Sequence, residues 1–85
     1  MVNELMFNEI MRMPSDKKGS IIFSLEKMSN YCKDIKLLTN EKNEVFYQVD
    51  ANVIRRLDLE SSDLLSLNQS GWVLNKNGNF LEFFI

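Results

Sequence analysis

The sequence contains no histidine and one cysteine among its 85 residues. Without histidine, the chain lacks the commonest general base, the commonest metal ligand and the usual partner of a serine or cysteine nucleophile. The single cysteine, Cys32, excludes an intrachain disulfide and is typical of a reducing compartment. No acidic array resembles a calcium loop, and the 3 glycines are too far apart for a phosphate-binding loop. We therefore expect no catalytic residues, no metal and no cofactor.

Long apolar runs and blocks of one charge are also absent. No stretch approaches the roughly 20 apolar residues of a membrane span, and the first residues lack the features of a signal peptide. The formal net charge is −2 and is spread along the chain, so no segment is basic enough to follow a phosphate backbone. These absences predict a small soluble cytoplasmic protein that does not contact a membrane.

The residues that are present are sufficient for one hydrophobic core. Hydrophobic residues make up 45% of the sequence, which is ordinary for a globular domain and too high for a disordered chain. A chain of this length has room for one core only. We therefore expect a single small globular domain over residues 1–85.

The last fifteen residues, 71–85, have the strongest local signal, and they include the only tryptophan and three of the six phenylalanines. Asn77-Gly78 lies between two apolar runs, and both residue types tolerate the positive φ of a tight hairpin turn. If this pair alone forms the loop, Leu74 faces Leu81. If a type I turn precedes the glycine instead, Val73 faces Leu81. The sequence predicts a C-terminal β-hairpin and leaves its register open.

The second strand of this hairpin has apolar side chains on both faces. Because side chains alternate along a strand, Leu81, Phe83 and Ile85 share one face, which we expect in the core. Phe80 and Phe84 lie on the other face, where two aromatic residues are unusual if the face is solvated. Either a helix covers this second face, or these two residues contact a second chain.

Apolar spacing and capping residues predict four short helices. We expect them near residues 3–13, 15–33, 51–57 and 61–70. Asn3 and Asp50 are expected to cap the first and third helices, because their side-chain oxygens accept free backbone N–H groups. Ser15 or Asp16 takes the same role for the second helix. Gly71 is expected just past the end of the last one.

Two of these helices have apolar residues spaced along one side. In the first helix this side consists of Leu5, Met6, Ile10 and Met13. In the second it consists of Ile21, Leu25, Met28, Cys32 and Ile35. We expect both sides in the core. Phe23 falls on the polar side of the second helix, which places it at the edge of the core or in a contact site.

Residues 35–49 have the composition of another hairpin. A polar turn separates residues 35–39 from residues 44–49, and the later segment is rich in β-forming side chains. Strands and helices alternate too irregularly for parallel βαβ units. The sequence therefore predicts an α+β fold, in which short helices pack on a small antiparallel sheet made of two hairpins, near 35–49 and 71–85.

For function, the sequence favours a small non-enzymatic protein-binding or regulatory module. It acts through an apolar and aromatic surface, on another protein or as a homodimer. The support is the absence of chemistry-bearing motifs together with aromatic residues on faces expected to be wet. The candidate contact residues are Phe23, Trp72, Phe80 and Phe84.

Two other classes of function have weaker support. A nucleic-acid-binding protein needs basic side chains that converge on one surface. The candidates are the adjacent pairs Lys17, Lys18 and Arg55, Arg56. Acidic residues close to the arginines would repel phosphate. An enzyme with paired carboxylates, for example Asp50 with Asp58, is the third class, but helix capping explains Asp50 more simply.

Overall fold

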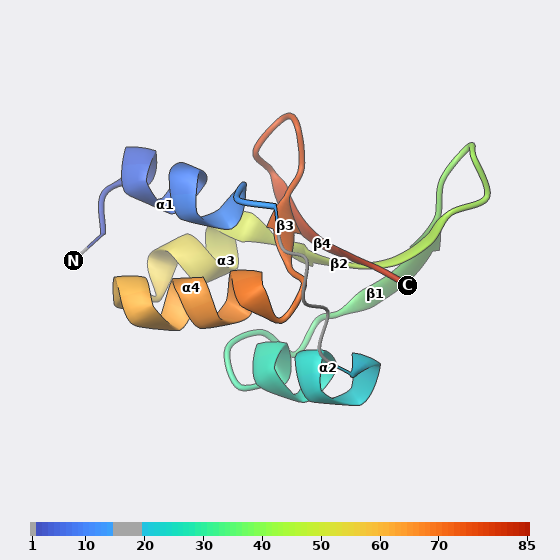
Figure 1. Ribbon diagram of the computed structural model, residues 1–85, viewed down its shortest axis with the longest axis horizontal. Helices are drawn as coiled ribbons and strands as arrows, with labels where there is room; N and C mark the ends of the chain where they lie inside the picture. Colours follow the sequence, from blue (N-terminus) through green and yellow to red (C-terminus); the bar gives the residue numbers. More distant parts are fainter. Residues whose placement is uncertain (1, 15–19) are drawn as a thin grey trace.

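The computed structural model describes residues 2–14 and 20–85. Within them the elements follow in the order α1 (Glu4–Met11), α2 (Ile21–Ser29), β1 (Lys36–Thr39), β2 (Val45–Asp50), α3 (Ala51–Arg56), α4 (Ser61–Gln69), β3 (Val73–Leu74) and β4 (Phe80–Phe84). The predicted α+β class is confirmed (Figure 1).

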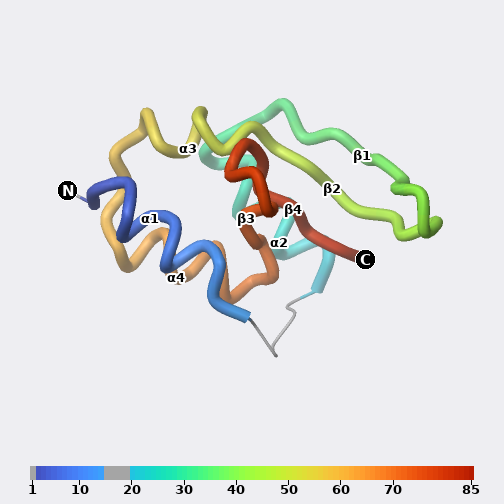
Figure 2. Tube along the Cα trace, turned by 90° about the horizontal axis from the view of Figure 1, so that it is seen from above, coloured from blue at the N-terminus to red at the C-terminus, as the bar shows by residue number. Residues whose placement is uncertain are grey.

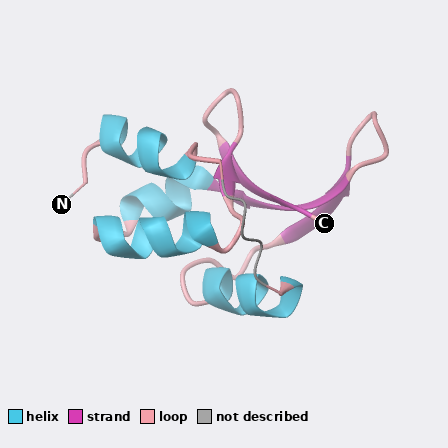
Figure 3. Cartoon of the chain, in the orientation of Figure 1, coloured by secondary structure: helices cyan, strands magenta, loops and turns pink. Residues whose placement is uncertain are grey.

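The four strands form one antiparallel sheet in the order β1-β2-β4-β3. Both predicted hairpins are present, β1 with β2 and β3 with β4, and the pairing of β2 with β4 joins them. The helices gather toward the β3 end of the sheet, whereas the β1–β2 hairpin extends away from them (Figure 3). Seen from above, α1 and α4 run side by side at the far end from this hairpin (Figure 2).

The inner face of the sheet, which carries Val49, Leu81 and Phe83, forms the floor of the core. Trp72 packs beside Phe83, with 5.7 Å between the ring centroids. Helical side chains complete the core, namely Phe7, Met11, Met28, Ile54, Leu64 and Leu67. The core therefore lies between the helices and the half of the sheet nearest β3.

The outer face of the sheet carries Phe46 and Phe84, whose rings stack at 5.0 Å with an interplanar angle of 29°. Neither ring belongs to the core cluster. In the described part of the chain no helix packs on this face, which differs from the expectation that a helix covers it. Phe46 lies between Leu38 of β1 and Phe84 of β4 and is only 7% exposed.

The predicted caps of the first and third helices are confirmed. Asn3 Oδ1 accepts from Met6 N at 2.8 Å, and Asp50 Oδ1 accepts from Asn52 N at 2.8 Å. The second helix differs from the prediction, because Ser20 is its cap and its last residue is Ser29. Residues 15–19, and with them both predicted caps, lie outside the described residues.

The predicted apolar side of α1 is wrong for three of its four residues, and only Ile10 packs against the core. Phe7 and Met11, one turn apart, are buried, whereas Leu5 is 68% exposed and Met6 and Met13 are also exposed. The ring of Phe7 lies under the guanidinium of an arginine from α3. This contact, together with the packing of α1 on α4, directs the side of the helix that carries Phe7 and Met11 toward the core.

The predicted side of α2 is correct in part. Met28 and Cys32 are buried, but Ile21 is 39% exposed. Ser24 takes the buried position one turn before Met28. Its Oγ donates to Ser70 O at 2.7 Å, which satisfies the hydroxyl inside the core. A polar residue at the centre of the buried side concealed the true orientation of this helix.

The C-terminal hairpin combines the two predicted alternatives. Leu74 faces Leu81, as in the first register. The turn nevertheless belongs to the second alternative, because Gly78 N donates to Asn75 O at 3.1 Å and Gly78 has φ of 77°. Asn75 Oδ1 also accepts from Asn79 N at 3.1 Å. Asn79, which follows the glycine, adds one residue to the loop. The strands therefore keep the register that the two-residue loop would give.

Candidate protein-binding surface

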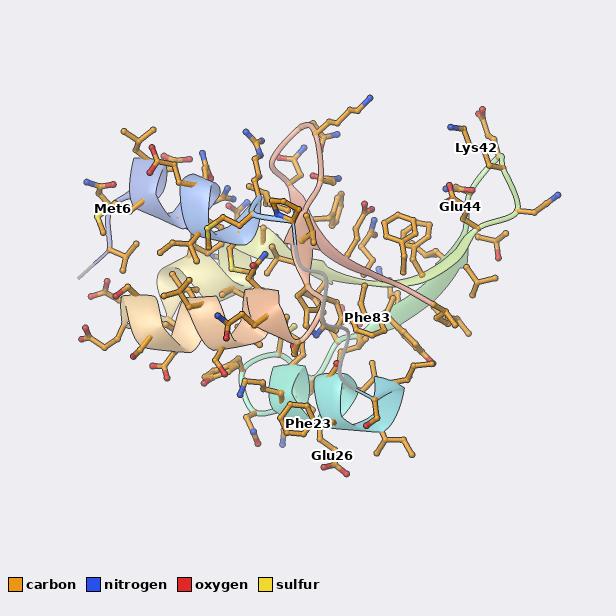
Figure 4. The ribbon with its side chains drawn as sticks, viewed as in Figure 1. Met6, Phe23, Glu26, Lys42, Glu44 and Phe83 are labelled. Carbon is orange, nitrogen blue, oxygen red and sulfur yellow. The ribbon has the colours of Figure 1, made fainter. Side chains whose placement is uncertain are left out.

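The structure does not bring the four candidate contact residues together. Phe23 is 53% exposed and lies on the side of α2 that points away from the sheet (Figure 4). Lys27 Nζ lies 5.3 Å from the centroid of its ring. Phe80 and Phe84 are half-buried on the outer face of the sheet. These residues therefore belong to two separate surfaces.

Trp72 is a core residue, and the prediction that it belongs to a contact surface is wrong. The side chain is fully buried. Its indole N–H donates to Ser24 O at 3.1 Å, and its carbonyl oxygen accepts from Asn68 Nδ2 at 3.2 Å. The tryptophan therefore connects α2, α4 and β3 inside the protein.

Exposed apolar side chains concentrate instead where the inner face of the sheet extends beyond the helices. Leu37 of β1 and Ile85 after β4 are each 58% exposed, and Val45 of β2 is 38% exposed. On α2, Ile22 is 70% exposed and precedes Leu25 by one helical turn. We name the complete set the α2–sheet surface; it consists of Ile21, Ile22, Leu25, Ile35, Leu37, Val45, Tyr47 and Ile85.

A groove of about 300 Å³ lies at the centre of the α2–sheet surface. Its walls are Leu25, Glu26 and Ser29 of α2 on one side and Ile35 and Tyr47 on the other. Apart from the carboxylate, the hydroxyl and the phenol, the lining is aliphatic. Such a groove is suited to bind an apolar side chain from another protein.

The pairing of the strands fixes the rest of this surface. Leu37 lies directly opposite Tyr47, and Ile85 N donates to Val45 O at 3.1 Å, so these four residues share the inner face. The composition of residues 35–49 predicted the strands that carry Leu37, Val45 and Tyr47. It did not locate the uncovered part of the face, because that depends on where the helices end in space.

A second recess, of about 350 Å³, lies between α1, α3 and the start of α4. Its lining includes Asn3, Glu4, Asn52, Arg55 and Asp58. Two carboxylates line it, those of Glu4 and Asp58, whereas Asp50, which the sequence pairs with Asp58 as a candidate, is not part of the lining. We therefore assign no reaction to this recess.

Arg55 has a structural role beside this recess. Its Nη1 donates to Asn52 Oδ1 at 3.0 Å and to Gly78 O at 2.9 Å, and its Nη2 donates to Asn8 Oδ1 at 3.1 Å. The guanidinium also stacks 4.7 Å above the ring of Phe7. The arginine thereby joins α3 to α1 and to the β3–β4 turn.

These contacts bear on the prediction that Arg55 and the other basic residues bind nucleic acid. Three of the four N–H groups on the terminal nitrogens of Arg55 donate to protein acceptors, which commits most of the guanidinium to contacts within the chain. Arg56 is exposed. Lys17 and Lys18 lie outside the described residues. The structure therefore does not assemble the predicted basic surface from the residues it describes.

The described residues include no group of three or more acidic or cysteine side chains placed to hold a metal ion. None of the helices in residues 2–14 and 20–85 is long and apolar enough to cross a bilayer. Comparison of the chain with protein-family models, with curated proteins and with solved structures found no match.

Proposed function

We propose that this chain is a small non-enzymatic binding module that takes a protein partner at the α2–sheet surface. The observation that carries the proposal is the continuity of this surface. Exposed aliphatic residues of α2, β1, β2 and the C-terminal segment surround one groove. Large contiguous apolar patches on soluble domains generally mark interaction sites.

The exposure of these side chains also has an energetic meaning. Burying apolar surface contributes about 25 cal/mol for each Å² removed from water. The fold leaves this contribution unused at Ile22, Leu37 and Ile85, which are between 58% and 70% exposed. A partner that covers them recovers it. The polar rim, with Glu26 and Ser29 in the groove, supplies hydrogen-bonding groups for orientation.

A pair of matched variants tests this proposal. Ile22→Asp and Leu5→Asp each place a carboxylate at the second residue of a helix, and the two native side chains are 70% and 68% exposed. Only Ile22 belongs to the α2–sheet surface. We expect proteins captured from lysate of the expressing cells to be retained by Leu5→Asp and lost by Ile22→Asp and by Leu37→Asp. Equal retention by all three variants would contradict the proposal.

A further inference from the structure

β1 is an open edge of the sheet. All of its residues, Lys36–Thr39, are exposed, and it runs along the margin of the molecule away from the helices (Figure 2). Asn40 N donates to Glu44 O at 3.1 Å, so Asn40 directs its backbone groups toward β2. Successive residues of an antiparallel strand direct their backbone N–H and C=O groups to opposite sides of the strand. Leu37 and Thr39 therefore direct these groups outward, away from β2. With respect to residues 2–14 and 20–85, this edge offers a short row of free donors and acceptors.

An apolar row crosses the outer face and ends at this edge. Leu38 lies directly opposite Phe46, and Phe46 lies directly opposite Phe84. Leu38 is 37% exposed at the end of the row. A second apolar side chain placed beside it would extend the row and cover Leu38.

We propose that the β1 edge pairs with the β1 edge of a second copy of this chain, antiparallel, about a two-fold axis at Leu38. This inference rests on the proposed function, because it names one protein partner of the binding module. Leu37 of each protomer exchanges backbone hydrogen bonds with the partner's Thr39. Leu38 then lies opposite the partner's Leu38, and the two apolar rows become one row across the axis.

The faces of the sheet restrict the register. A two-fold axis perpendicular to a sheet keeps outer residues beside outer residues, so Leu38 pairs with itself or with another outer residue. A shift of two residues in one direction places Lys36 opposite the partner's Leu38, inside the apolar row. A shift in the other direction places Leu38 opposite the partner's Asn40. The symmetric pairing at Leu38 is the one that joins apolar to apolar.

The charges beside the β1 edge favour a second copy of this chain as the partner. In this register Lys36 lies opposite the partner's Asn40. In each chain, Asn40 Nδ2 donates to Glu44 Oε1 at 3.0 Å, on the outer face next to Asn40. Lys36 of each protomer is thus directed toward the partner's Glu44, and the symmetry creates this pair twice. Figure 4 shows Glu44 at the base of the β1–β2 turn.

Cysteine cross-linking tests the axis directly, in a Cys32→Ala background that removes the only native thiol. Opposed residues of a non-hydrogen-bonded antiparallel pair have Cα atoms about 4.5 Å apart, within the range of a disulfide. We expect Leu38→Cys to form a covalent dimer on mild oxidation. Leu37→Cys, although its position is more exposed, should remain monomeric, because diagonal partners are about 7–8 Å apart. Equal cross-linking at both positions, or none at 38, overturns the proposed axis.

A charge exchange tests the partner. Lys36→Glu and Glu44→Lys each place like charges across the interface in a homodimer, and we expect each to weaken self-association by about tenfold. An equimolar mixture restores both opposite-charge pairs, so it should form a heterodimer at wild-type concentrations, as measured by sedimentation velocity. Failure of the mixture to associate more strongly than either variant alone overturns the proposal.

The two proposals fail separately. Ile22 lies on α2, away from the β1 edge, so Ile22→Asp should leave the mass of the dimer unchanged. A wild-type protein that stays monomeric throughout a concentration series overturns self-pairing. If that monomer still captures a protein in an Ile22-dependent manner, the proposed function stands without the dimer.

Discussion

The two edges of the sheet, at β3 and at β1, differ in the hydrogen bonds that the rest of the chain makes to them. Directly before β3, Trp72 N donates to Leu67 O at 3.3 Å and Trp72 O accepts from Asn68 Nδ2 at 3.2 Å. Arg12 Nη2 donates to Lys76 O at 3.2 Å in the turn that follows. At β1, the alternation directs Leu37 and Thr39 outward, and the described residues supply them with no such partner.

The chain thus covers the β3 edge of the sheet and leaves the β1 edge exposed. Open strand edges promote pairing with other chains, and proteins usually protect them. Here the chain protects the edge next to its core and leaves the other edge exposed beside its most apolar surface. Under the proposal that the β1 edges pair, the exposed edge serves association and the protected edge serves the stability of the monomer.

The largest expected effect comes from placing a charge on each edge strand. Leu74→Lys buries an ammonium at a position that is 4% exposed and should lower the free energy of unfolding by about 4 kcal/mol. Leu37→Lys, on the same inner face but 58% exposed, should change it by less than about 0.5 kcal/mol. Urea unfolding followed by tryptophan fluorescence measures both. Comparable losses would show that β1 is as enclosed as β3.

Two glycines flank β3, Gly71 before the strand and Gly78 in the turn after it, and substitution of the two should have different costs. Gly71 has φ of 121°, and a Cβ there would lie 2.5 Å from Phe83 Cε2, so we expect Gly71→Ala to cost about 3 kcal/mol. Gly78 has φ of 77° and an added Cβ meets its nearest neighbour, Arg12 Nη2, at 3.7 Å. Gly78→Ala should therefore cost only about 1 kcal/mol. Thermal unfolding of the two variants measures the difference, which a rigid turn at Gly78 would abolish.

Removal of the side chain that protects β3 should have the next largest effect. Asn68 is 2% exposed, and its Nδ2 donates to Met13 O at 3.0 Å as well as to Trp72 O. Asn68→Ala leaves the buried Trp72 carbonyl and the partly buried Met13 carbonyl without this donor and should cost about 2 kcal/mol. The exposed Asn77→Ala serves as the control and should be close to neutral. A neutral Asn68→Ala would mean that other groups close this edge.

The smallest effect on stability is expected from proline at the open edge. Thr39→Pro removes a donor that points outward, so the free energy of unfolding of the monomer should change by less than about 1 kcal/mol. The same change should abolish self-association. Leu38→Pro removes a donor that points toward β2 and should cost about 2 kcal/mol. Equal losses in the free energy of unfolding for the two variants would contradict the assignment of the Leu38 N–H toward β2 and the Thr39 N–H outward.

Local signals predicted much of the fold. Asn3 and Asp50 cap helices as expected, because a cap depends on a side chain and on N–H groups a few residues away. Gly71 lies where a helix must end with a positive φ. The composition of residues 35–49 and 71–85 predicted both hairpins. These features depend on neighbours in the sequence.

Features that depend on distant contacts were not predictable in the same way. The buried side of α1 is set by the contact of Phe7 with Arg55 and by packing on α4. Trp72 is enclosed because Ser24 and Asn68, from two different helices, provide its hydrogen-bond partners. The α2–sheet surface exists because α2 stops short of covering the end of the sheet. Hydrophobic patterning cannot distinguish a covered apolar face from an uncovered one.

Amide hydrogen exchange, resolved by residue and recorded at increasing dilution, measures the difference between the two edges most directly. We predict that in the dilute monomer the amides of Leu37 and Thr39 exchange rapidly while those of Leu38 and Trp72 remain protected. At high concentration Leu37 and Thr39 should become protected as the edges pair. Slow exchange of Leu37 and Thr39 at every dilution, equal to that of Trp72, would contradict an open β1 edge.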